Sequence, residues 1–388
     1  MKKIKTFLNS ITIICVISVL FCTCANNQSS RKAIVSGQLT GSIPVEQNRD
    51  STIITLSVPN PILLGGERIE YETTPKGDGT FTVSIPLLCS TYAGISIDYG
   101  EDAGYLFVSP GKETKIEVFF NEAGETQIRM IDGKGLTREE IGKMYEVSMD
   151  VLPALQDGRN SPDFQLNMPP KAYADSMFIR MERDLSIVKT TTKIPEESKQ
   201  LLYNTMRLSY LNYFLLDYEE QMRLFYLNLH FGEDVNENDF TPITPDRSYY
   251  SFLKDFDLNH PPYFDYVYYP MILESLLDNK VLNIPPIEDL PIKDWMKEVK
   301  AIMADLIGAD TGLFYDLLAA KTYHKQFTDE LKPLSDKQKE NIQTYFKNPS
   351  FAAILFAENE KILEAVREIS KYKKETPAVP KEELMNAI

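Results

Sequence analysis

The hydrophobic pattern of this chain changes its period at residues 133–141, which read GKGLTREEI. Before this stretch, apolar and polar residues alternate, and a period of two is typical of β-strands with one buried face. After it, apolar residues recur every three or four positions, which is typical of amphipathic helices. The sequence therefore predicts the α+β class, with a β region at residues 32–132 and a helical region at residues 137–375.

The β region contains six clearly alternating segments. They lie at residues 35–39, 54–58, 69–71, 81–85, 95–99 and 116–120. Glycine-containing stretches at 65–66, 77–79 and 110–111 indicate turns, and Asp78-Gly79 is the strongest hairpin signal. Six to eight short strands at this spacing predict an antiparallel β-sandwich.

The helical region opens with a capping box, in which Thr137 and Glu140 are spaced to satisfy free amides of the first helical turn. Residues 335–338 supply a second capping box with the same spacing. Prolines then divide the region into helices, and the longest is expected at residues 195–229. Five apolar residues recur in it at sevenfold spacing: Leu201, Leu208, Leu215, Met222 and Leu229. A wider apolar face favours burial in a helical bundle, and a coiled-coil dimer is the alternative.

The N-terminus has the features of a bacterial lipoprotein signal. Three lysines among the first five residues precede an apolar run at residues 7–21, which is too short to span a bilayer. The run ends at Cys22-Thr23-Cys24, and the small Thr23 makes Cys24 the expected lipidated residue. We therefore expect a signal peptide at residues 1–23, lipidation at Cys24 and a polar tether at residues 24–31.

The charge of the chain limits its partners. The formal net charge is −15, and loss of residues 1–23 removes three lysines and no acid, which gives −18. Nucleic acids and anionic lipid surfaces both favour basic proteins, so we expect no nucleic-acid partner and no membrane contact beyond the lipid anchor.

Cysteine content excludes two classes of site. Cys15 and Cys22 would leave with the signal peptide, so Cys89 would remain as the only unmodified cysteine of the mature protein. A disulfide framework and an internal Cys-x-x-Cys redox centre are therefore not expected. The apolar segment at residues 85–89 favours an inert buried thiol at Cys89 over a reactive one.

Metal and cofactor motifs are weak throughout. His230, His260 and His324 have no partner at metal-ligand spacing, so no metal site is expected. Residues 234–245 begin like a calcium loop but lack its glycine and its final glutamate. Residues 133–137 resemble a phosphate-binding loop only loosely, and a β-to-α turn explains their glycines better. The sequence therefore predicts neither a cofactor nor a recognisable catalytic constellation.

One aromatic run is a candidate ligand-binding surface. It contains Tyr249, Tyr250, Phe252, Tyr263, Phe264, Tyr266, Tyr268 and Tyr269. Tyrosines on loops can stack on sugars or contact a protein partner, because they combine contact area with a polar tip. The alternative is that these rings pack between helices. The candidate ligand-binding residues are Tyr249, Tyr250, Tyr263, Phe264, Tyr266 and Tyr268.

Four segments in order resemble a known family. They are IVSGQLTG at residues 34–41, GDGTFTV at 77–83, FVSPGKETKIEV at 107–118 and TGLFYDLLAA at 311–320. Together they resemble the non-catalytic front part of lipoprotein thiol–disulfide oxidoreductases of the TlpA/ResA thioredoxin-like family, as found in Bacteroidetes. In that family a β domain and a helical segment precede a thioredoxin domain with a Trp-Cys-x-x-Cys active site. The resemblance covers most of residues 32–375.

No catalytic residue of the family is present here, because the only tryptophan, Trp295, has no cysteine near it. Residues 376–388 read as a linker and the start of a truncated helix, as if a thioredoxin domain were to follow. The resemblance implies a lipid-anchored accessory module that binds a protein partner in thiol–disulfide exchange and is not itself an enzyme. The alternative is a glycan- or peptide-binding lipoprotein of the cell envelope. No acidic residue follows Cys24 directly, so we expect the periplasmic face of the outer membrane.

Overall fold

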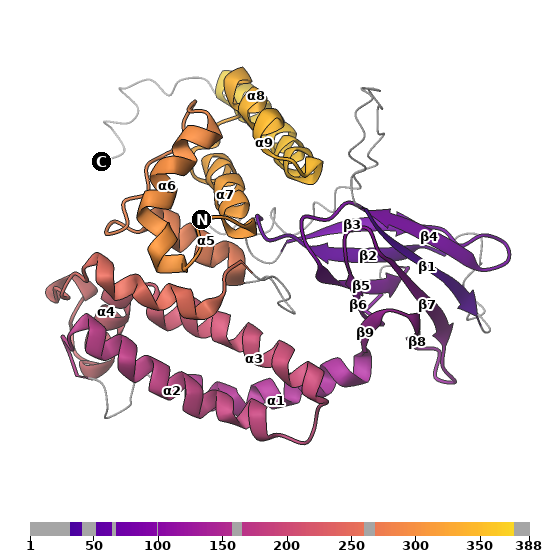
Figure 1. The fold of residues 1–388 in the computed structure, drawn as a ribbon, viewed down its shortest axis with the longest axis horizontal. Coiled ribbons are helices and arrows are strands. Elements are labelled where there is room, and N and C mark those ends of the chain that lie inside the picture. Colours follow the sequence, from indigo (N-terminus) through magenta and orange to yellow (C-terminus); the bar gives the residue numbers. More distant parts are fainter. Residues whose placement is uncertain are drawn as a thin grey trace. The chain divides into compact units, whose positions relative to one another are not determined.

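The computed structural model describes residues 32–40, 52–63, 67–98, 100–156, 165–259 and 268–375. It confirms the α+β class, with two mostly antiparallel sheets followed by a helical region (Figure 1). None of the helices in these ranges is both long and apolar enough to cross a membrane. The expected signal peptide, Cys24, the tether, the Gly65-Gly66 turn and the C-terminal segment lie outside the described residues.

The strands form a four-stranded sheet and a five-stranded sheet. The first sheet, sheet A, has the order β4(Thr80–Ile85), β1(Ala33–Thr40), β7(Glu113–Phe120) and β8(Thr126–Asp132). The second, sheet B, has the order β3(Arg68–Thr73), β2(Ile54–Pro59), β5(Thr91–Ile97), β6(Gly104–Val108) and β9(Lys134–Thr137). All six segments with period two contribute to strands. The β region extends to Thr137, because residues 134–137 form a strand that leads directly into the first helix.

Two details of the sandwich correct the sequence prediction. Pairing is not wholly antiparallel, because β1 and β7 run parallel. The turn at Asp78-Gly79 forms, but it joins β3 of sheet B to β4 of sheet A and so is not a hairpin within one sheet. A turn signal reports the local backbone and does not report which sheet the next strand enters. Gly79 has φ 84°, a conformation that favours glycine.

Sheet B is covered on both of its faces. All seven residues of β5 are buried, whereas β4 alternates between buried and less buried positions. Ala93 and Ile95 belong to the core between the sheets, and Tyr92, on the opposite face of β5, belongs to the helical core. The helices therefore pack against the outer face of sheet B, so that the two hydrophobic cores meet along this sheet.

Nine α-helices lie in the described ranges. They are α1(Arg138–Gln156), α2(Pro170–Thr190), α3(Glu196–Tyr210), α4(Tyr218–Leu229), α5(Tyr268–Asp278), α6(Ile292–Ile307), α7(Leu313–Glu330), α8(Asp336–Tyr345) and α9(Pro349–Glu375). Both predicted capping boxes are confirmed. Thr137 N donates to Glu140 Oε2 at 2.8 Å, and Ser335 and Gln338 cap α8 in the same way.

The single long helix expected at residues 195–229 is wrong. A π-helical turn at Leu211–Leu215 follows α3, and Asp217 then begins α4 by accepting a hydrogen bond from Glu220 N. A side-chain cap starts a new helix here because it satisfies amides that the previous helix leaves free. Four of the five residues at sevenfold spacing are buried in the helical core of this chain, and Leu229 is exposed. The pattern thus forms part of an internal core, and a coiled-coil seam is not needed to explain it.

Candidate functional site

The aromatic run is divided by the structure. Tyr249 and Tyr250 lie in a 3-10 helix, Arg247–Phe256, and both rings are buried. Tyr249 Oη donates to Leu215 O at 2.7 Å, and Asn279 Nδ2 donates to Tyr250 Oη at 2.8 Å. Burial raises the pKa of both hydroxyls, so they stay neutral. These two rings therefore pack between helices and offer no exposed face on which a sugar or peptide could stack.

The other candidates of the run are placed differently. Tyr268 is half-buried and meets the exposed Tyr213 edge to face, with ring centroids 5.5 Å apart. Tyr263, Phe264 and Tyr266 lie outside the described residues. A ligand surface formed by these aromatic residues stays a prediction.

The titratable groups of the described ranges do not form a metal centre. No three His, Cys, Asp or Glu side chains converge within those ranges. His230 Nδ1 lies 2.9 Å from Tyr226 O, and His324 is buried in α7, where burial and the nearby Lys321 lower its pKa to about 4. His260 lies outside the described residues.

The two other motifs have structural explanations. Asn236 caps a short 3-10 helix, Glu237–Asp239, in a reciprocal capping box with Asp239. The possible calcium loop at this position is therefore a capped polar turn. In the glycine-rich stretch, the Lys134 ammonium pairs with Glu197 of α3.

Cys89 leads to a different site. Its side chain is half-buried, which is more accessible than the inert, fully buried thiol favoured by the sequence. It lines a small hollow that opens to solvent. The lining residues come from the end of β2 and the two residues after it, from β3, from the β4–β5 connection, from the first residue of β5 and from α9: Val58, Pro59, Asn60, Pro61, Ile69, Tyr71, Pro86, Leu87, Leu88, Cys89, Thr91 and Ile354. We call this the sandwich-end hollow.

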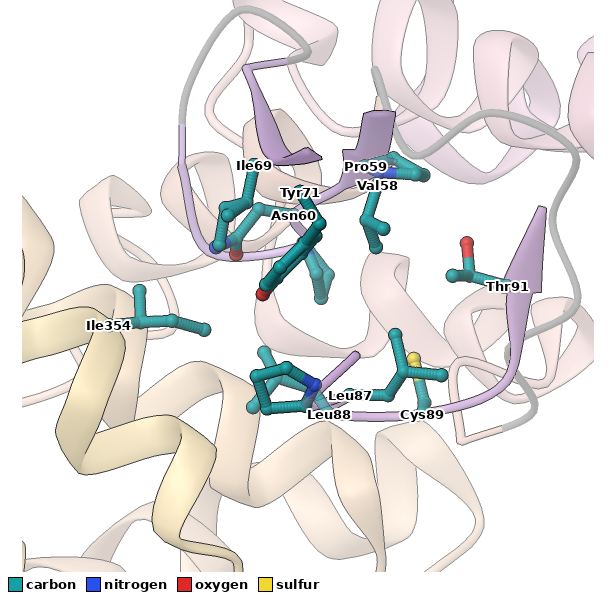
Figure 2. Close-up of a pocket in the computed structure, with 12 residues that line it drawn as sticks. Val58, Pro59, Asn60, Ile69, Tyr71, Leu87, Leu88, Cys89, Thr91 and Ile354 are labelled. Atoms are coloured by element: carbon teal, nitrogen blue, oxygen red, sulfur yellow. The ribbon is translucent and has the colours of Figure 1, made fainter. Parts of the chain in front are cut away.

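Strand geometry explains how these residues meet. Val58 and Leu87 belong to the core between the two sheets, and Cys89 and Ile354 pack against the helical core. The hollow therefore lies where the two cores meet. Figure 2 shows Tyr71 between Ile354 of α9 and Val58, with the segment Leu87–Cys89 opposite.

Two hydrogen bonds of Asn348 hold the start of α9 beside the hollow. Asn348 Nδ2 donates to Leu87 O at 2.9 Å, and Asn348 Oδ1 accepts from Ser350 N at 3.0 Å in the first turn of α9. The same asparagine thus caps the helix and fixes the β4–β5 connection. Because 261 sequence positions separate the two partners, the site exists only in the folded chain.

Two polar side chains of the hollow are buried without a hydrogen-bond partner. Asn60 is 3% exposed, and although its Oδ1 accepts from Ile62 N at 2.9 Å, its Nδ2 has no partner among the described residues. Thr91 is 1% exposed, and its Oγ1 is likewise unpaired within the described ranges. An unsatisfied buried polar group costs about 1–3 kcal/mol and therefore needs an explanation.

The chemistry of the hollow is neutral. None of its lining residues carries a charged side chain, although the whole chain has a net charge of −15. Burial raises the pKa of Tyr71 to about 12, so its hydroxyl is neutral at any physiological pH. The site can therefore bind an uncharged group through apolar contact and a few hydrogen bonds, and it holds no paired acid and base.

Sequence reasoning found Cys89 and missed the rest of the site. Asn60-Pro61 resembles any polar turn, and Thr91 resembles any first residue of a strand. Comparison with protein-family models finds no match for this chain, and comparison with curated proteins finds none either.

Proposed function

We propose that this chain is a lipid-anchored, non-catalytic module of the bacterial cell envelope that binds a protein partner and assists thiol–disulfide exchange carried out by that partner. The observation that carries the proposal is the sandwich-end hollow, where two buried polar side chains are unpaired beside a half-buried thiol. Unpaired groups in a neutral, mostly apolar hollow are typical of a site that a partner completes.

The cysteine content supports an assisting role. Thiol–disulfide cycling needs a second cysteine to resolve the mixed disulfide, and Cys89 is the only cysteine in the described residues. The four segments that resemble the TlpA/ResA family lie in both parts of the fold, from Ile34 in β1 to Ala320 in α7. The proposal that redox chemistry belongs to another polypeptide or domain follows from these two points.

Site-specific photocross-linking in intact cells tests this role. A photoreactive amino acid replaces Ile354, which lines the hollow, and in a matched control it replaces the exposed neighbour Ala353 on the same helix. We expect a cross-linked protein from position 354, much less from position 353, and a partner whose cysteine pair shifts mass after thiol alkylation. Cross-linked partners that all lack a cysteine pair would contradict the redox role.

The lipid anchor is a separate part of the proposal and rests on the sequence around Cys24. We expect incorporation of labelled palmitate into the wild type and none into Cys24→Ser. Protease treatment of intact cells tests the proposed position on the periplasmic face of the outer membrane. Resistance in intact cells and digestion after permeabilisation support it, whereas rapid digestion of intact cells would overturn it.

One observation keeps the glycan-binding alternative open. Tyr213 is 50% exposed and contacts Tyr268, which adjoins the remaining aromatic candidates in sequence. Exposed aromatic pairs provide stacking surfaces for sugars. Binding on a glycan array that is lost in Tyr213→Ala and Tyr268→Ala would favour this function, and no binding to any glycan would exclude it.

A further inference from the structure

The C-terminal end of α4 exposes two apolar side chains. Leu229, the last residue of the helix, is 56% exposed, and Phe231 is 92% exposed, more than any other large apolar side chain of the described ranges. Leu229 is also the one residue of the sevenfold series that the helical core does not bury. Single exposed apolar side chains are common on protein surfaces, so what surrounds these two matters.

The backbone next to Phe231 is held in place by the residues around it. Glu233 N donates to His230 O at 2.9 Å, so the chain closes a turn directly after the helix. The Tyr226 ring stacks on Phe240, with ring centroids 5.2 Å apart, and its centroid lies 4.4 Å from that of His230. The loop therefore folds back onto α4, and the backbone of Phe231 loses less conformational freedom on binding than that of an unanchored loop would.

Negative charge surrounds this end of the helix. Glu233 and Asp234 follow Phe231 closely in the sequence, and both are exposed and have no ion-pair partner in the described part of the chain. Residues 224–246 include no lysine or arginine and five acidic residues: Glu233, Asp234, Glu237, Asp239 and Asp246. The exposed apolar side chains thus lie beside acidic side chains that no basic residue of the same segment compensates.

This combination of apolar and acidic side chains restricts what can cover the surface. An anionic lipid surface would repel Glu233 and Asp234, and so would a second copy of this chain, whose net charge is −15. A protein surface with an apolar pocket and with lysine or arginine at its rim complements both features. Aromatic side chains often anchor such contacts, because they bury a large area with few rotatable bonds.

We propose that the C-terminal end of α4 docks onto a basic protein partner, with Phe231 in an apolar pocket of the partner and with Glu233 and Asp234 beside lysine or arginine side chains at its rim. Leu229 covers the adjacent apolar surface. None of these four residues lines the sandwich-end hollow, so the inference concerns a second surface and goes beyond the proposed function.

Photocross-linking in intact cells tests this surface on the full-length chain. Benzoylphenylalanine replaces Phe231, and in the matched control it replaces Tyr145 of α1, another aromatic residue, which is 65% exposed. We expect a product with another protein from position 231 that is at least about fivefold more abundant than any product from position 145. Mass spectrometry of the product identifies the partner.

Reversal of charge tests the acidic part of the surface. Glu233→Lys combined with Asp234→Lys should lower the product from position 231 about fivefold, because the basic rim of the partner would then be repelled. Glu122→Lys combined with Asp310→Lys makes the same change of net charge at two other exposed positions and should leave the product unchanged.

Removal of the ring tests the apolar part. With benzoylphenylalanine at the exposed neighbour Asn228, Phe231→Ala should lower the product about tenfold, and Phe231→Trp should retain most of it. Because Phe231 is almost fully exposed, both variants should fold as the wild type does, which urea denaturation checks.

A protein product that depends on the ring and on both acidic residues supports the inference. No protein product from position 231, equal products from positions 231 and 145, or a product unaffected by the charge reversal would overturn it. A product with a second copy of this chain, or with lipid alone, would also overturn it. Because position 354 is not involved, failure here leaves the proposed role of the hollow intact, and a failed cross-link from position 354 leaves this second surface intact.

Discussion

The tyrosine cluster around Tyr249 and the lining of the sandwich-end hollow both contain buried polar side chains, but these side chains differ in hydrogen bonding. In the cluster, the hydroxyl of Tyr249 donates a hydrogen bond to Leu215 O, that of Tyr173 to Phe214 O and that of Tyr218 to Met168 O. In the hollow, Asn60 Nδ2 and Thr91 Oγ1 have no hydrogen-bond partner within the described residues. The cluster is therefore complete as a core, whereas two buried polar atoms of the hollow are left unpaired in the described part of the chain. The pairing of polar atoms therefore distinguishes these two regions better than residue type does.

The largest expected loss of stability comes from a substitution in the tyrosine cluster. Tyr249→Ala removes a buried ring that contacts Tyr218, Tyr250 and Phe252, and it leaves a cavity. We expect the free energy of unfolding to fall by about 3–5 kcal/mol, measured by urea denaturation. The control is Phe231→Ala, at a ring that is 92% exposed, with a change within about 0.5 kcal/mol. Equal effects of the two variants would contradict the assignment of Tyr249 to the core.

The buried His324 lies outside the hollow and should make the stability of the fold depend on pH. His324 Nδ1 has no hydrogen-bond partner in the described ranges, and burial lowers the pKa of this histidine to about 4, below its ordinary value near 6.5. The unfolded chain therefore binds the proton more readily than the folded chain, so stability is full above pH 6.5 and falls as the pH drops toward 4.

His324→Gln should remove this part of the pH dependence. Between pH 7.5 and pH 4.5, we expect the wild type to lose about 2–3 kcal/mol more stability than the variant, measured by urea denaturation at each pH. Parallel pH profiles would show that the histidine is not neutral in the folded state.

Removal of one hydroxyl from the cluster should have a moderate effect. Tyr249→Phe keeps the ring but leaves Leu215 O without its hydrogen bond, so we expect a loss of about 1–2 kcal/mol. Chemical denaturation measures the change, with Tyr213→Phe at a half-exposed ring as the control. No loss in Tyr249→Phe would mean that the hydroxyl is not paired.

Removal of a hydroxyl group from the hollow should raise the free energy of unfolding, whereas its removal from the cluster should lower it. Thr91→Val replaces an unpaired buried hydroxyl with a methyl group of similar shape, so we expect the protein without its ligand to gain about 0.5–1 kcal/mol. Thr55→Val should give a similar gain, because its hydroxyl is also buried and unpaired in the described part of the chain. A loss of stability in Thr91→Val would show that this hydroxyl has a partner.

Local patterns predicted much of the fold. Alternation located β1, β2, β3, β4, β5 and β7, and the capping boxes at Thr137 and Ser335 located two helix starts. Strands β6, β8 and β9 were not located by alternation. β6 and β9 are short, and the adjacent apolar residues Met130 and Ile131 interrupt the alternation of β8. The break between α3 and α4 was present in the sequence as Asp217 followed by Glu219 and Glu220, a helix-start signal that the sevenfold apolar spacing obscured.

The candidate site was largely beyond sequence reasoning. Cys89 was noticed because cysteine is rare in this chain, but its half-buried state depends on how α9 packs against the β4–β5 connection. The place of α9 beside this connection depends in turn on a long-range contact, which Asn348 makes with Leu87. A sequence pattern reports which residues can form hydrogen bonds and cannot report which bonds the fold leaves unmade.

The most direct test of the partner-binding proposal is photocross-linking in intact cells from position 354 of the sandwich-end hollow, compared with position 353 on the same helix. We predict a cross-linked protein with a cysteine pair from position 354 and much less product from position 353. No cross-linked protein from position 354, or equal amounts from both positions, would contradict the assignment of the hollow as a binding site.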